Sequence, residues 1–132
     1  MNTEIPIKII LLWFILIIAM ILHFNYHVGD IFYGIDVVKE GANGKVSNGA
    51  HIIRNVFYHL PIILILTLMY FKSKSVRLIF FIISIIYTLS HIIHLIKDLA
   101  STNASQTPLL SLTLIVSITL NIEQFKYWKS HN

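Results

Sequence analysis

The feature that most constrains the fold of this chain is a set of four long hydrophobic segments that take up most of its 132 residues. Only 12% of the residues are charged, about half of the ~25% typical of soluble domains. Each segment comes close to the ~20 apolar residues that a helix needs to cross a ~30 Å hydrocarbon core. The predicted membrane spans are residues 9–29, 55–71, 78–96 and 108–122, and the second helix is expected to begin near Gly49.

This pattern predicts an all-α fold, a four-helix transmembrane bundle formed by residues 1–132 as one domain. No segment alternates as a membrane β-strand would, and none has the charged face that a soluble helix presents to water. We therefore expect an integral, multi-pass membrane protein whose partner is the lipid bilayer. A homo-oligomer and a membrane partner subunit both stay open, and the basic charge is better explained by topology and anionic lipid than by nucleic acid.

Two connections shape the bundle. Residues 72–75 form a tight link, which predicts that the second and third helices are antiparallel neighbours. The first loop, residues 30–50, is longer, and its Asn43-Gly44 pair is a strong hairpin signal. A short hairpin or lid and a plain connector are equally compatible with the loop. Pro61 inside the second helix is expected to disturb the backbone beside His59. The disturbance could aim the imidazole inward, and a simple packing kink is the alternative.

The distribution of lysine and arginine predicts that both termini are cytoplasmic. Six of these residues lie at the end of the bundle that holds the termini, and four lie at the other end. Because cytoplasmic segments carry the excess of positive charge, the six-residue end is assigned to the inside. The six are Lys8, Lys72, Lys74, Arg77, Lys126 and Lys129, and the four are Lys39, Lys45, Arg54 and Lys97.

Six of the seven histidines lie at the other, outward end of three spans. Ionisable side chains are costly in a bilayer and rarely occur there without a partner or a role. His23 and His27 close the first span, His51 and His59 open the second, and His91 and His94 close the third. A rise of ~1.5 Å per residue sorts them by depth into layers. His23, His59 and His91 are predicted to form an inner layer, His27 and His94 an outer one, and His51 the mouth.

Converging imidazoles point to a transition metal. Three histidines and one open position describe a catalytic zinc site, and imidazole also suits copper and iron. Asp98 continues the His91 and His94 stripe, so that it could bind the ion or orient a ligating ring, and Asp30 could do the same. The candidate metal ligands are His23, His27, His59, His91, His94 and Asp98.

Whether the protein is an enzyme is left open by the sequence. In an enzyme, a metal-bound water would be the reactive group, with Asp98 or Asp30 as general base. One alternative is a b-type haem protein for electron transfer, in which His23 and either His91 or His59 ligate the iron. The other is a cofactor-free membrane subunit whose histidines respond to pH.

Overall fold

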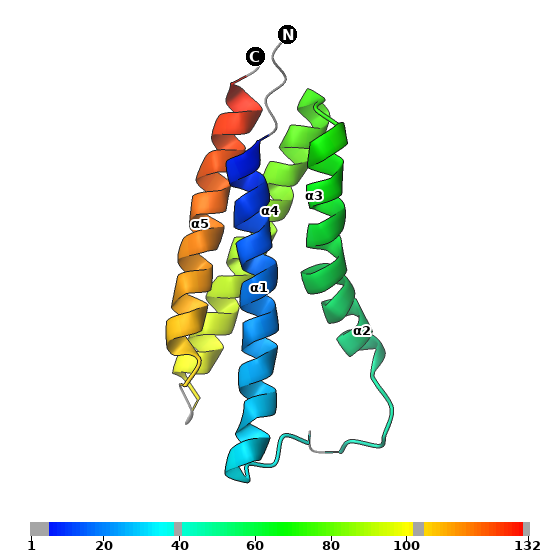
Figure 1. The fold of residues 1–132 in the computed structure, drawn as a ribbon, viewed down its shortest axis with the longest axis vertical. Coiled ribbons are helices and arrows are strands. Elements are labelled where there is room, and N and C mark those ends of the chain that lie inside the picture. Colours follow the sequence, from blue (N-terminus) through cyan, green and yellow to red (C-terminus); the bar gives the residue numbers. More distant parts are fainter. Residues whose placement is uncertain (1–5, 39–40, 102–104, 131–132) are drawn as a thin grey trace.

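The computed structural model describes residues 6–38, 41–101 and 105–130. Within these ranges the chain is helical without any strand, and four helical stretches are long and apolar enough to cross a membrane. The stretches run alternately up and down, so that the start of the first and the end of the last lie at the same end of the bundle (Figure 1). The predicted all-α four-helix membrane bundle is confirmed.

The first span is helix α1, Ile7–Gly29, which covers the predicted segment and begins two residues earlier. A short 3-10 turn, Asp30–Tyr33, prolongs it beyond the predicted end. Gly34 then adopts a left-handed conformation with φ of 77°, and its backbone N–H bonds back to the turn. Glycine adopts this conformation without steric cost, which explains why the helix stops here.

The second span consists of helix α2, Asn48–Arg54, a π-helical turn, Asn55–His59, and helix α3, Leu60–Tyr70. These three parts follow one another without a break. The Ser47 hydroxyl accepts a hydrogen bond from the Ala50 backbone N–H at 3.2 Å and caps the first turn. The span therefore begins within a residue of the predicted start.

The π-helical turn is the disturbance expected from Pro61. Proline has no N–H to bond the Phe57 carbonyl, so the regular pattern cannot continue through this point. The Leu60 N–H bonds instead to the Asn55 carbonyl, five residues back. The backbone prediction is confirmed, but His59 is exposed on the surface of the bundle and does not point inward.

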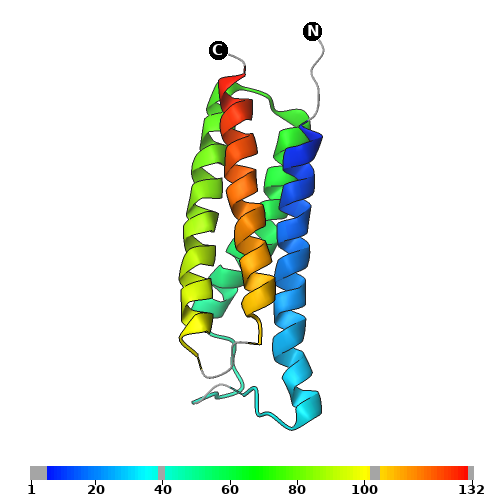
Figure 2. The same cartoon turned by 90° about the vertical axis from the view of Figure 1, so that its left-hand side faces the viewer.

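The third and fourth spans are helices α4, Lys74–Leu99, and α5, Thr107–Lys129. The Ser73 hydroxyl caps α4 by accepting from the Val76 N–H at 3.3 Å. Pro108 lies in the first turn of α5, where the absent N–H would have no partner within the helix. The two helices lie side by side along the bundle (Figure 2).

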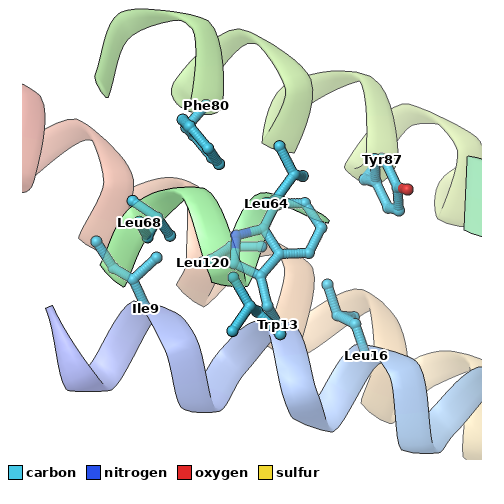
Figure 3. Packing of buried hydrophobic residues seen from close by; sticks show 9 residues of the cluster. Ile9, Trp13, Leu16, Leu64, Leu68, Phe80, Tyr87 and Leu120 are labelled. Atoms are coloured by element: carbon cyan, nitrogen blue, oxygen red, sulfur yellow. The ribbon is translucent and has the colours of Figure 1, made fainter. Parts of the chain in front are cut away.

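A cluster of large apolar side chains lies in the half of the bundle where α1 begins and α5 ends. Figure 3 shows how these side chains pack together. Trp13 is 0% exposed, and its ring meets the Tyr87 ring edge-on with centroids 5.1 Å apart. The Tyr87 hydroxyl donates to the Val56 carbonyl, which joins α4 to the π-helical turn as antiparallel neighbours. The cluster contains Ile9, Trp13, Leu16, Leu64, Ile65, Leu68, Phe80, Tyr87 and Leu120.

The first loop contains no strand in its described residues, so the connector is observed and the hairpin is not. The Asn43 side chain accepts a hydrogen bond from the Lys45 N–H at 3.1 Å, and Gly44 has a φ of 75°. The Asn-Gly pair thus forms a local turn without a ladder. Residues 39 and 40, which lie inside the proposed hairpin, are outside the described residues.

Candidate functional site

Two helices bring histidines together at the end of the bundle where α1 ends and α5 begins, which we call the histidine end. His23 and His27 lie four residues apart on α1 and share a face. His94 approaches them from the last turns of α4. The Nε2 atoms of His94 and His23 are 3.1 Å apart, and their ring centroids are 4.7 Å apart. The His27 ring also lies 4.7 Å from the His23 ring, edge-on.

These three imidazoles line a cavity of about 280 Å³ that also contains two carboxylates, Asp30 and Asp98. Asp98 is held in place because its Oδ2 accepts a hydrogen bond from the Thr107 hydroxyl at 2.6 Å. The lining is His23, His27, Asp30, His94, Lys97, Asp98, Ser101, Ser105 and Gln106. Four of the six predicted metal ligands, His23, His27, His94 and Asp98, therefore lie around one cavity.

His91 and His59 are placed elsewhere. His91 is 4% exposed and packs against the rings of Phe57 and Tyr87, with centroids 6.1 Å and 6.3 Å away. His59 is exposed, and its Nδ1 lies 2.8 Å from the Asn55 Oδ1. Among the described residues, no three His, Asp or Glu side chains are placed so that they could share one ion. The predicted inner layer of His23, His59 and His91 is therefore not formed.

The inner layer is absent because the three histidines lie on helix faces that do not meet, and not because their depths differ. Helical rise fixes how deep a residue lies, but a side chain meets another only where the faces agree. Phe57 points toward α4 from the π-helical turn, and His59, two residues further, points to the opposite side. His91 lies about one turn below His94 and meets the Phe57 ring instead of an imidazole.

Two residues from the start of α5 belong to the site and were missed by sequence reasoning. Thr107 holds Asp98, and Gln106, 5% exposed, lines the cavity. The Gln106 Oε1 and the His23 Nδ1 are both buried. The signal was the position of the helix start: Thr107 and Pro108 open α5 only nine residues after Asp98, so this turn must return to the same end of the bundle.

The contact between His94 and His23 is compatible with two chemistries. In the absence of an ion, one neutral imidazole donates an N–H to the bare nitrogen of the other. Two nitrogens that bind one tetrahedral zinc ion at ~2.0–2.1 Å lie ~3.3 Å apart, close to the observed 3.1 Å.

No protein-family model, curated protein or solved structure shows a significant match to this chain. The function is therefore argued from the site alone.

Proposed function

We propose that this integral membrane protein binds a transition metal ion at the histidine end, between His23 and His94. The observation that carries the proposal is the 3.1 Å separation of the two Nε2 atoms. Imidazole nitrogens are good ligands for zinc, copper and iron, and the chain has no cysteine to supply a thiolate. Of these metals zinc fits best, because two nitrogens bound to one tetrahedral zinc ion lie at nearly the observed separation.

The third ligand in this proposal is His27. Its ring already touches that of His23, and it is exposed, so rotation about its side-chain bonds requires no repacking of the core. Three imidazoles would leave a fourth position for water or a transferred ligand, as in catalytic sites. Asp98 would orient His94 or His23 by accepting a ring N–H, because outer carboxylates of this kind fix the tautomer of a ligating histidine. An open fourth position serves metal handling as well as catalysis.

The orientation belongs to the same proposal. The start of α1, the end of α5 and residues 71–73 lie at one end of the bundle, together with six of the ten lysines and arginines. The positive-inside rule assigns this end to the cytoplasm. The histidine end then faces outward, and the ion would be taken from or delivered to the outer side.

Metal analysis of the purified protein, with metal titration of three variants, tests the proposal. His23→Ala and His94→Ala should each lose more than the ~10–100-fold in affinity that removing an outer-shell partner costs. The matched control is His59→Ala, which removes an exposed histidine bonded to Asn55 outside the cavity, and it should bind metal like the parent protein. Equal retention of metal in all three variants would overturn the proposal.

The same preparation separates the alternatives. A Soret absorbance band would support the haem hypothesis instead. A protein that neither contains nor takes up metal would favour the cofactor-free subunit, in which the histidine pair responds to pH because two protonated imidazoles in contact repel each other.

A further inference from the structure

A pair of polar side chains lies on the outside of the second span. Asn55 and His59 are exposed, are one turn apart and are joined by a 2.8 Å contact between the Asn55 Oδ1 and the His59 Nδ1. Ile63, Leu66 and Tyr70 continue their row at helical spacing, and all three are exposed as well. We call this row, Asn55, His59, Ile63, Leu66 and Tyr70, the α3 outer face.

The polar pair lies at membrane depth. His59 is 13 residues from Lys72, the first cation beyond α3, which corresponds to ~20 Å along a helix. In a hydrocarbon core ~30 Å thick, the imidazole is then ~10 Å from the far boundary, too deep to reach the headgroups. The opposite side of the turn, at Phe57, packs against α4, so His59 cannot turn into the bundle. Ionisable residues at this depth in membrane helices almost always face protein or a water-filled cavity.

The hydrogen-bonding groups that remain on the pair match a second copy of themselves. When His59 donates its Nδ1–H to Asn55, its Nε2 is left as an acceptor and the Asn55 Nδ2 keeps its donors. In the opposite assignment the Asn55 amide donates to the His59 Nδ1, so that His59 keeps its Nε2–H as a donor and Asn55 keeps its amide oxygen as an acceptor. The pair therefore offers complementary groups within one turn of helix.

We propose that two copies of the chain form a dimer through the α3 outer face, with Asn55 of each copy hydrogen-bonded to His59 of the other. Two copies inserted in the same direction are related by a two-fold axis along the membrane normal, so the same residues meet at the same depth. A second copy thus supplies the matching groups at the required depth. Asn and His side chains on membrane helices stabilise association by such interhelical bonds.

Cysteine cross-linking in membranes tests the interface, and the chain has no cysteine of its own. Leu66→Cys places a thiol on the α3 outer face, at a side chain that is 52% exposed. Ile115→Cys, at a side chain that is 60% exposed on α5, is the matched control. Oxidation should produce a disulfide-linked dimer from Leu66→Cys and little from Ile115→Cys. Equal yields from both, no dimer from Leu66→Cys, or capture of a different protein would overturn the proposal.

The polar pair itself is tested in the Leu66→Cys background. Asn55→Leu and His59→Leu should each weaken dimerisation about 3- to 30-fold, the range that corresponds to measured interhelical hydrogen bonds in membranes. Thr119→Val is the control, because the Thr119 hydroxyl is exposed but bonds the Ile115 carbonyl of its own helix. Circular dichroism establishes that the variants retain their helices. An unchanged dimer yield in correctly folded Asn55→Leu and His59→Leu variants would refute the assigned contact.

Discussion

The bundle has two sides that are held together in different ways, the α4–α5 pair and the side formed by α1 and α3. All eight buried polar or charged residues among the described ranges lie on α4, on α5 or directly before α5. The buried residues of α1 and α3 are apolar without exception. The eight are Arg77, Ser84, Thr88, His91, Gln106, Thr113, Ser117 and Gln124.

The difference shows two solutions to one problem. In a bilayer, apolar surface gains nothing by leaving lipid, so helices associate through close packing and interhelical hydrogen bonds. The α4–α5 pair uses small hydroxyl residues and two hydrogen bonds between the helices. The Asn121 Nδ2 donates to the Thr88 hydroxyl at 2.8 Å, and the Thr107 hydroxyl donates to the Asp98 Oδ2 at 2.6 Å. The buried side chains of α1 and α3 are apolar and interlock around Trp13, where they also meet large side chains from α4 and α5.

The polar row of α4 and the apolar row of α1 lead to the same place, the histidine end. On α4 the buried polar row of Ser84, Thr88 and His91 continues at helical spacing to His94 and Asp98. On α1 the buried row is apolar until the position of His23. The candidate metal site is thus the outer end of the polar row, completed by the last turns of an otherwise apolar helix.

The largest effect should come from the apolar side. Trp13→Ala removes a fully buried ring, and truncations of this kind cost ~3–5 kcal/mol in soluble cores. We expect a loss near the lower end of that range. A side chain that moves from lipid into the bundle gains no hydrophobic transfer free energy, so only the loss of packing around the cavity contributes. Unfolding by SDS in mixed micelles measures it. Leu11→Ala, on the exposed face of α1, is the control and should change little; similar losses in both would contradict interlocked packing on this side.

A smaller effect should come from the α4–α5 pair, where the size of the Ser117 side chain should affect stability more than its polarity. Ser117 is 0% exposed. Its hydroxyl donates a hydrogen bond to the Leu114 carbonyl of its own helix at 2.9 Å and forms none with the described residues of α4. Ser117→Leu should destabilise the protein by ~1–3 kcal/mol through overpacking, whereas Ser117→Ala should be nearly neutral. The same SDS titration distinguishes them. If Ser117→Ala destabilised the protein more than Ser117→Leu, the polarity of the hydroxyl, and not the close approach of the two helices, would stabilise the α4–α5 pair.

The contrast between the two sides also explains what could be predicted from the sequence. The positions of the spans, the helix start near Gly49 and the disturbance at Pro61 follow from local composition and stereochemistry, and they agree with the structure, although the helices extend beyond the predicted apolar segments. His23 and His27 could be assigned to one face because α1 is regular. The sides to which His59 and His91 point depend on the π-helical turn and on which ring fills the space beside α4. Those are properties of packing between helices, which no single segment specifies.

The last and smallest effect concerns Asp98, where the polar row ends. Asp98→Asn keeps an oxygen that can accept the Thr107 hydroxyl, so the start of α5 should remain in place, but it removes the negative charge beside the histidines. We expect metal affinity to fall by at least ~10-fold, about 1.4 kcal/mol, because a carboxylate raises the basicity of a ligating imidazole more than an amide does.

Thr107→Val separates the charge of Asp98 from its position. This variant removes the hydrogen bond and keeps the carboxylate, so metal titration should show a smaller loss than in Asp98→Asn. If Thr107→Val lost as much affinity as Asp98→Asn, the position set by α5 would matter more than the charge. If neither variant lost affinity, Asp98 would serve only to fasten the start of α5 to the end of α4, and the ion would be held by the histidines without a carboxylate.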